Sequence, residues 1–444
     1  MPNAVRPSFV VVGAGLVGSM MAAFLGREGF PVEVIERRGD PRSGAMAAGR
    51  SINLAISARG LNAIAQLGLD PDIASLGVPL YGRMIHSVAG GRGYQLYGDG
   101  KQAINSFSRG DLNLALVRAA GNTPNVRLAF GRRCLDVDVQ TGTVTHVDHE
   151  TGGDRHESSG VIVGTDGAYS VVRAALQRRE HQEYSQSYLE HGYKELFIPA
   201  RPDGTPALER NAMHIWPRGR FMMMAMANLD GSFTVTLYLA MEGDNSFRQL
   251  ASRAEVRAFF EREFPDAVPL MPTLLDDFFT NPTGSMVTVR TFPWSVGGQA
   301  VLAGDAAHAI VPFYGQGANA GFEDCLALIA EITRSPTDLA AAFGRYQTRR
   351  KPDTEAIADL AIANFLEMRD HVASAGFLWK KRFEQLLHRL FPRWFVPLYQ
   401  MISFSLIPYA EARDRAHAQT RAIRRIGIAA VLVGGVGIVL TLIL

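Results

Sequence analysis

Three glycines near the start of the chain have the spacing of a phosphate-binding turn. Gly13, Gly15 and Gly18 form the pattern GxGxxG, and Glu36 follows 23 residues after Gly13. In this pattern the first glycine makes a tight turn, the second lets the backbone approach a pyrophosphate, and the third lets a helix pack closely on a strand. The carboxylate would accept a hydrogen bond from a ribose hydroxyl. The spacing predicts a dinucleotide site, the alternative being a glycine-rich turn in an unrelated α/β fold.

Two further motifs follow later in the chain, each after a short apolar run. Residues 164–173 read GTDGAYSVVR, an Asp-Gly pair followed by Ser and Arg, and residues 304–312 read GDAAHAIVP. The second motif continues into residues 315–321, GQGANAG, at the start of a predicted helix. A helix that begins there would turn its N–H groups and positive dipole end toward a negatively charged ligand. We interpret His308 as packing beside the Gly-Asp turn rather than as a catalytic base.

Other chemistries lack their motifs. The segment 98–102, GDGKQ, does not complete a phosphate-binding GxxxxGK[ST] loop, and neither CxxC nor HExxH occurs, so nucleotide hydrolysis and a metal site have no support. The two cysteines, Cys134 and Cys325, lie far apart in the chain and exclude a disulfide framework. A net charge of +2 over 444 residues gives no basic field for nucleic acid.

The elements that must position these motifs follow from hydrophobic patterning. Strands are predicted at Phe9–Val12 and Val32–Ile35, on either side of a helix over residues 19–28, which makes a βαβ unit with its glycines in the first turn. Strands at Val161–Gly164 and at residues 300–303 lead into the other two motifs. The three motifs are therefore expected at the ends of strands in one nucleotide-binding fold.

A different pattern separates the second motif from the third. Residues 221–227 and 232–239 flank the turn sequence Asn-Leu-Asp-Gly and predict an antiparallel hairpin. In its second strand Thr234 and Thr236 alternate with apolar residues, so one face is expected to be apolar and the other polar and solvated. This predicts a sheet-based substrate domain inserted into the nucleotide-binding fold.

The last quarter of the chain is predicted to be helical and to end in an apolar tail. Helices are expected from residue 338 to about residue 408, with stops at Pro352, Pro392 and Pro397. Residues 426–444 carry no charge and follow three arginines. A 19-residue helix spans about 28 Å, close to a bilayer core of about 30 Å. The tail predicts a membrane helix whose arginine-flanked end faces the cytoplasm; a buried or oligomer-forming helix is the alternative.

The ordered set of GxGxxG, Asp-Gly and Gly-Asp motifs resembles that of the flavoprotein aromatic hydroxylases. Longer segments, residues 49–57, 83–87, 214–218, 304–312 and 321–325, look like those of the kynurenine 3-monooxygenases, and the resemblance covers nearly the whole chain. The apolar tail fits as well, because eukaryotic members carry a C-terminal membrane segment. The resemblance implies a bound FAD, and NADPH as a transient co-substrate, since no second GxGxxG is present.

The resemblance also assigns residues to the cofactor. In that family the aspartate of the Gly-Asp motif meets the ribityl chain of FAD, and the next helix points its N-terminus at the pyrimidine edge of the flavin. With the motif residues included, the residues expected to hold FAD are Gly13, Gly15, Val17, Gly18, Glu36, Arg37, Arg38, Ala55, Arg109, Leu135, Asp305, Gly317, Ala318 and Asn319.

A second set is expected to bind L-kynurenine. The matching positions are Arg83, Tyr97, Asn364, Glu367, Met368 and Tyr399. Their types suit a zwitterion with an aniline ring, because an arginine offers a bidentate clamp for the carboxylate and Glu367 could hold the ammonium. Offsets of three and four place Asn364, Glu367 and Met368 on one helical face. The chain departs from the family at Tyr314, where Phe or His is frequent, which leaves the tuning of uncoupling or of substrate entry open.

The implied reaction is hydroxylation of L-kynurenine at ring position 3, with NADPH and O₂, to give 3-hydroxy-L-kynurenine. In the family a flavin hydroperoxide carries the oxygen, so no protein residue is expected to be catalytic, and the protein orients the ring and excludes water. Two alternatives are a hydroxylase of a membrane-held aromatic such as a quinone precursor, and a non-enzymatic flavin-binding membrane regulator. The four residues Arg83, Tyr97, Asn364 and Tyr399 argue against a prenylated ring.

The predicted fold is α/β: a Rossmann-like FAD-binding domain with an inserted, mostly antiparallel substrate sheet, a helical C-terminal region and a transmembrane helix. The expected boundaries are 1–180 for the first part of the FAD domain (with a substrate-side segment near 75–105), 181–285 for the sheet, 286–335 for the second part, 336–425 for the helices and 426–444 for the anchor. The expected location is membrane-anchored with the catalytic part in the cytoplasm, at a bacterial inner membrane or, in a eukaryote, the mitochondrial outer membrane. The oligomeric state is left open.

Overall fold

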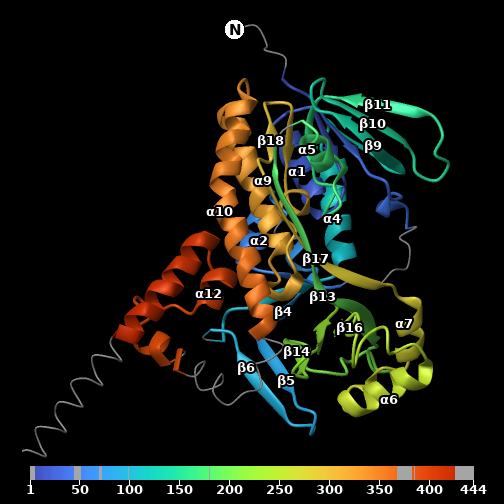
Figure 1. Ribbon diagram of the computed structural model, residues 1–444, viewed down its shortest axis with the longest axis vertical. Coiled ribbons are helices and arrows are strands. Elements are labelled where there is room, and N and C mark those ends of the chain that lie inside the picture. The colour runs from blue at the N-terminus through green and yellow to red at the C-terminus, as the bar shows by residue number, and fades with distance from the viewer. Residues whose placement is uncertain are drawn as a thin grey trace, which may run out of the picture.

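The computed structural model describes seven stretches of the chain, residues 6–44, 52–69, 73–98, 100–179, 181–367, 383–384 and 386–425. Figure 1 shows a nucleotide-binding sheet with its helices in the upper part of the molecule and a second, larger sheet below it. Two long strands, β13 (Glu183–Ile198) and β17 (Thr283–Phe292), run between the two parts.

The nucleotide-binding sheet has the strand order β18-β19-β12-β1-β2-β8. All neighbours are parallel except β18 and β19. Because parallel sheets are covered on both faces, their strands are continuous apolar runs, as in the FVVV of β1. The strands and the helices that pack on them are β1 (Phe9–Val12), β2 (Val32–Ile35), β8 (Val126–Ala129), β12 (Val161–Gly164), β18 (Ser295–Val296), β19 (Ala300–Leu302), α1 (Leu16–Arg27), α4 (Arg109–Gly121) and α5 (Val171–Gln177).

Three of the four strands predicted here have the predicted bounds. The fourth, β19, ends at Leu302, one residue earlier than expected, and α1 begins at Leu16, three residues earlier than expected. The helix starts early because Gly15 is its N-cap, so the glycine turn leads into the helix directly. The amide groups of the first helical turn consequently lie beside the glycine motif itself.

The larger sheet has the order β17-β13-β16-β15-β14-β5-β6. Its neighbours are antiparallel except β14 and β5, where Ala212 lies opposite Gly82 in a parallel pair. The predicted hairpin is present, with Ala227 opposite Phe233. The remaining strands and the two helices that follow them in the chain are β5 (Gly82–His86), β6 (Arg92–Leu96), β14 (Ala212–Pro217), β15 (Met222–Ala227), β16 (Phe233–Ala240), α6 (Arg253–Glu263) and α7 (Leu274–Thr280).

Two three-stranded sheets and several short helices accompany the two large sheets. One small sheet has the order β3-β7-β4 and the other β11-β10-β9. Their strands and the short helices are β3 (Leu54–Ile56), β4 (Gly77–Leu80), β7 (Ile104–Phe107), β9 (Arg132–Asp138), β10 (Thr143–Asp148), β11 (Arg155–Ser159), α2 (Ala58–Gln66), α8 (Asp305–His308), η1 (Pro41–Ser43), η2 (Val268–Leu270) and η3 (Pro312–Tyr314).

The C-terminal region is helical, but the predicted stop at Pro352 is wrong. Helix α10 (Leu339–Leu366) continues through this proline and packs beside α9 (Gly317–Arg334). A proline inside a helix costs about 3 kcal/mol. Burial of Tyr346 and Ile357 on either side of it, each worth about 1.5–3 kcal/mol, together with the ion pair from Arg350 to Asp324 of α9, outweighs that cost.

The chain then forms α12 (Leu398–Ser403), for which Pro397 is the N-cap rather than a stop, and a helix over residues 409–425. A small apolar cluster that includes Ile357, Met401 and Tyr409 joins these helices to α10. Among the helices of the described stretches, none has the length and apolar character needed to span a bilayer. The tail predicted to do so, residues 426–444, lies outside the described residues.

Candidate active site

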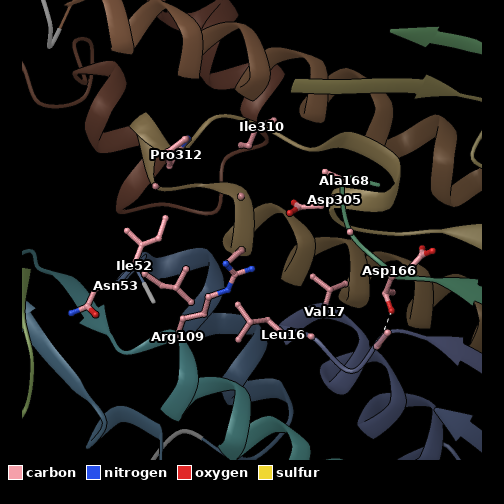
Figure 2. Close-up of a pocket in the computed structure, with 18 of the residues that line it drawn as sticks. Leu16, Val17, Ile52, Asn53, Arg109, Asp166, Ala168, Asp305, Ile310 and Pro312 are labelled. Carbon is pink, nitrogen blue, oxygen red and sulfur yellow. Dashed lines mark hydrogen bonds between the residues drawn. The ribbon is translucent and has the colours of Figure 1, made fainter. Parts of the chain in front are cut away.

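A cavity of about 920 Å³ is lined by residues of both large sheets. Figure 2 shows the part of its wall built by the glycine turn, α4 and the segment from Asp305 to Pro312. Of the predicted cofactor residues, those that line the cavity are Gly13, Gly15, Val17, Glu36, Arg37, Arg38, Ala55, Arg109, Leu135, Asp305, Gly317 and Ala318. The other two, Gly18 and Asn319, lie behind the wall. The volume of this cavity is within the range of cofactor and ligand pockets.

The three glycines of the first motif have different surroundings. Gly13 has φ +100°, a conformation that favours glycine, and a Cβ there would lie 2.8 Å from the carbonyl oxygen of Thr165. A Cβ on Gly18 would lie 1.8 Å from the carbonyl oxygen of Gly13, so this glycine permits packing of α1 on the turn. A Cβ on Gly15 would meet no atom within 4 Å. The space in front of Gly15 is therefore open to a ligand at the start of α1, which fits a pyrophosphate.

Glu36, at the end of β2, is held as an anion beside the glycine turn. Its carboxylate accepts hydrogen bonds from the amide of Ala14 at 2.7 Å and from the Nε of Arg38 at 2.9 Å. Burial would raise the pKa of Glu36, but the hydrogen bonds and charge of Arg38 and the amide of Ala14 lower it below its usual value. The ionised carboxylate of Glu36 could accept a hydrogen bond from a ribose hydroxyl in addition to those from Arg38.

The Asp-Gly and Gly-Asp motifs meet at one side of the cavity. Arg173 donates to the carbonyl of Ala168 at 2.6 Å and to that of Ala306 at 3.0 Å, and so ties the two motifs together. Asp305 enters the cavity from α8, and Arg109 reaches into it from α4 (Figure 2). Burial raises the pKa of Asp305, while the charge of Arg109 opposes the rise. These two residues can accept from and donate to the polar chain of a dinucleotide.

Asn319 uses its amide within the protein. Its Nδ2 donates to the carbonyl oxygens of Ala55 at 2.9 Å and Gly315 at 2.7 Å, and its Oδ1 accepts from the amide of Ser57 at 3.0 Å. The side chain is fully buried. Asn319 therefore fixes the first turn of α9 to the end of β3, and Gly317 and Ala318 of that turn border the cavity.

At the other end of the cavity Arg83 lies among tyrosines. Its guanidinium is 4.7 Å from the ring of Tyr399 and its Nε is 3.4 Å from the hydroxyl of Tyr97. The two tyrosine rings stack with their centres 5.4 Å apart. Within the described stretches Arg83 forms no ion pair. A guanidinium that borders a cavity without a carboxylate of its own suits an anionic ligand group.

The remaining predicted substrate residues lie near η3, apart from Met368, which is outside the described residues. Asn364 donates to the carbonyl oxygen of Phe313 at 2.7 Å. Tyr314 stacks on Tyr399 with ring centres 5.8 Å apart. Burial, with Tyr399 and the carboxylate of Glu367 nearby, raises the pKa of Tyr314 above its usual range. Asn364 and Glu367 thus lie near Phe313 and Tyr314, which line the cavity, but neither they nor Tyr97 line it themselves.

The polar face of β16 was predicted to be solvated, and this was wrong. Thr234, Thr236 and Tyr238 line the cavity, and Thr236 is only 4% exposed. The residue alternation was visible in the sequence, but which side of the sheet would face solvent depends on what packs there. Met224 of β15 lines the same wall and was not predicted, because a methionine inside a hydrophobic strand is not distinguishable from core.

His308 packs beside the Gly-Asp turn. Its ring is buried and hydrogen-bonded to the carboxylate of Asp324, which also accepts from the amide of Gly304 at 3.0 Å. Burial would raise the pKa of Asp324, but the charges of His308 and Arg350 lower it. His308 faces the α9 side rather than the cavity wall, in agreement with a packing role.

Two of the buried histidines on the sheet that carries Arg83 are hydrogen-bonded to each other. His86 Nδ1 is 2.8 Å from the carboxylate of Asp266, and its Nε2 is 2.9 Å from Nδ1 of His214. His214 Nε2 is 2.9 Å from the carbonyl oxygen of Glu209, which can only accept, so His214 carries its proton on Nε2 and accepts from His86. Burial, together with the nearby charge of His86, lowers the pKa of His214 to about 4.

This pKa predicts a loss of stability in mild acid. In the unfolded chain His214 binds a proton near pH 6.5, and in the folded chain it does so near pH 4. The stability that the neutral, buried His214 contributes is therefore complete above pH 6.5 and is lost as pH falls toward 4. Between pH 7 and pH 5 the unfolding free energy should fall by about 2 kcal/mol through this group. Urea unfolding of His214→Gln should show a smaller fall, whereas His149→Gln, at an exposed site, should match the unchanged chain. An equal pH dependence in all three would contradict the assignment.

The fold and the cavity define an FAD-binding protein. Residues 8–361 match the family described as an FAD binding domain. Among solved structures, 2-methyl-3-hydroxypyridine-5-carboxylic acid oxygenase superposes with a TM-score of 0.67 at 19% identity, over 86% of this chain and 98% of that one. This similarity shows the shared fold.

The sequence comparison is more specific. The chain is 48% identical to the kynurenine 3-monooxygenase of Myxococcus xanthus over 92% of its own length and 88% of the relative. It is 45% identical to the kynurenine 3-monooxygenase of Dictyostelium discoideum over 91% and 89% of the two chains. The chain belongs to the kynurenine 3-monooxygenase family, and the resemblance predicted from its motifs is confirmed.

Proposed function

We propose that this protein hydroxylates L-kynurenine at ring position 3, with NADPH and O₂ as co-substrates, and releases 3-hydroxy-L-kynurenine. Family membership supports the reaction. The observation that supports this substrate is the position of Arg83, which borders the same cavity as the predicted FAD residues. Among the described residues its partners are phenols rather than a carboxylate, and an amino acid can offer that carboxylate.

The protein's own residues bind and orient the substrate. Arg83 would hold the carboxylate, and Tyr97 and Tyr399, which stack on one another, would fix the guanidinium in place. Glu367, near Tyr314, is proposed to attract the ammonium group, and Asn364 lies one helical turn before it on α10. Met368 is proposed for the same site from the family match alone. The apolar and threonine-lined wall of β15 and β16 would exclude water from the ring.

FAD, when bound, supplies the reducing equivalents taken from NADPH and the activated oxygen that is transferred. The residues proposed to hold it are the twelve cavity-lining positions given above, with Gly18 and Asn319 shaping the turn and helix behind them. Because the cofactor carries the chemistry, the chain needs no nucleophile. Its contribution is position, exclusion of water and the polarity of the cavity.

The test is NADPH consumption by the purified, FAD-loaded chain with and without L-kynurenine, with the product identified by mass. We expect NADPH to be consumed faster with L-kynurenine present, and most of the NADPH consumed to be matched by an equal amount of 3-hydroxykynurenine. Faster NADPH use that yields only peroxide would not support hydroxylation. Turnover of a prenylated phenol but not of kynurenine would favour the membrane-held substrate, and a yellow protein without substrate-stimulated NADPH use would favour a regulator.

We further propose that residues 426–444 anchor the protein in a membrane, from their length and lack of charge. A chain that ends at residue 425 should leave the membrane fraction of lysed cells while its kcat/KM for kynurenine stays within about twofold. Two charges placed in the tail, Val433→Arg with Val436→Arg, should have the same effect, because each costs about 2.5–3.5 kcal/mol in a bilayer core. Sedimentation with membranes in spite of both changes would refute the anchor.

A further inference from the structure

Arg59 at the start of α2 is a fully buried arginine outside the cavity wall. Its Nε donates to the carbonyl oxygen of Ile402 at 2.9 Å, and its Nη2 donates to those of Met401, at 3.3 Å, and Ile407. Its Nη1 pairs with Glu323 of α9 at 2.7 Å. One guanidinium therefore satisfies three carbonyls at and after the end of α12, where helix carbonyls have no intrahelical partner.

The segment that follows α12 is held at the same place by a second set of contacts. The guanidinium of Arg59 lies 3.9 Å from the ring centre of Tyr409. The hydroxyl of Tyr409 donates to Gln316, the N-cap residue of α9, at 2.8 Å. The amide of Ala410 donates to Asp353 of α10 at 3.0 Å. The segment is thus bound to α2, α9 and α10 by these polar contacts, in addition to the apolar cluster that includes Ile357, Met401 and Tyr409.

Residues near both ends of this connection line the cavity. Ser57, the N-cap residue directly before α2, donates its amide to Asn319, and Ala55 lines the cavity nearby. At the other end, α12 carries Tyr399, which stacks against Tyr97 and Tyr314 and covers Arg83. Figure 1 shows α12 beside α10, at the edge of the molecule away from α6 and α7. The position of Tyr399 therefore depends on what holds α12.

We propose that Arg59 is a positioning residue for the hydroxylation: it fastens residues 398–410 to the FAD-binding part and so keeps Tyr399 over Arg83. The inference rests on the proposed function for its effect on turnover, but the attachment itself can be measured without substrate. Lysine cannot replace Arg59, because an ammonium lacks the planar fork that reaches three carbonyls and a carboxylate together and stacks on a ring.

The test compares Arg59→Lys with the unchanged chain, both loaded with FAD. Hydrogen–deuterium exchange should accelerate at least tenfold in residues 398–410 and stay unchanged in β1 and α1. The KM for L-kynurenine should rise about tenfold or more, and the share of NADPH that ends as peroxide should increase, while the flavin content stays the same. The matched control is Arg345→Lys, which changes an arginine that pairs with Glu331 of α9 at 2.6 Å and should alter none of these.

Tyr409→Leu is the second variant, to be used if Arg59→Lys does not fold. It removes the stacked ring and the hydroxyl from the other side of the contact, and we expect the same changes in exchange, KM and peroxide yield. Unchanged exchange in residues 398–410, or faster exchange with unchanged KM and peroxide yield, would overturn the proposal. Loss of FAD from both variants would show a general folding role and would also overturn it. If the unchanged chain does not turn over kynurenine, the proposed function fails, and the exchange rates still decide whether Arg59 holds the segment.

Discussion

Replacing Arg83 by Ala should raise the KM for L-kynurenine about a hundredfold or more while FAD stays bound. The guanidinium lies between Tyr97 and Tyr399 and has no carboxylate partner among the described residues, so we expect the substrate to supply one. Hydrogen bonds to charged groups contribute about 1.5–3 kcal/mol each, and two lost bonds therefore cost about 3 kcal/mol or more. At about 1.4 kcal/mol per tenfold, this gives the expected change.

The measurement is steady-state hydroxylation with the flavin content recorded for each variant. Arg83→Lys keeps the charge but loses the bidentate geometry, and we expect an intermediate KM. Arg92→Ala removes an exposed arginine from the neighbouring strand β6 and should leave KM unchanged. If Arg83→Ala loses its yellow colour but binds kynurenine as before, Arg83 belongs to the cofactor site and the substrate assignment fails.

Gly15→Ala should weaken FAD binding about 10- to 100-fold without destabilising the apoprotein. A Cβ at this position meets no protein atom within 4 Å, and φ is −72°, so the folded chain accepts it. The methyl group would instead occupy the space proposed for the pyrophosphate. Overfilling a packed site costs about 1–3 kcal/mol, which sets the size of the effect. FAD titration followed by flavin fluorescence and urea unfolding of the apoprotein measure the two quantities.

Gly18→Ala is the matched comparison within the same motif. Its Cβ would lie 1.8 Å from the carbonyl oxygen of Gly13, so we expect a lower unfolding free energy of the apoprotein itself. Gly39 does not line the cavity, and a Cβ there would meet no atom within 4 Å. Gly39→Ala should therefore change neither the FAD affinity nor the unfolding free energy. If Gly15→Ala and the unchanged chain bind FAD with equal affinity, the pyrophosphate does not lie at this turn.

The cofactor half of the candidate site was predictable because it depends on local backbone geometry. The turn with Gly13 and Gly18, and the acid Glu36 at the end of the next strand, keep a fixed spacing in any chain that forms this βαβ unit. Asp305 follows its strand in the same way. The bounds of β1, β2 and β12 were read directly, since buried parallel strands are short apolar runs with clear ends.

The substrate half was less predictable, because residues far apart in the sequence build it. Thr234 and Thr236 gave the pattern of a strand with one polar face, but only the packing of that face against the FAD-binding part made it a cavity wall. Pro352 is a helix breaker by local rules, and the helix passes through it because the burial and ion pairs of its neighbours are worth more than the lost bond. Arg59 carried no sequence signal at all.

The sequence by itself indicated the family and a dinucleotide site, because the spacing of these motifs is set by short-range backbone geometry. The residues expected at the substrate end came from the resemblance to the family. The tertiary structure decided which side chains meet. It placed Arg83 beside Tyr399, more than three hundred residues away, and left the space in front of Gly15 open. It also bonded the side chains of Asn319 and Arg59 to backbone carbonyls of distant segments. Such contacts depend on how separate elements pack, and packing is a property of the whole chain that no local pattern contains.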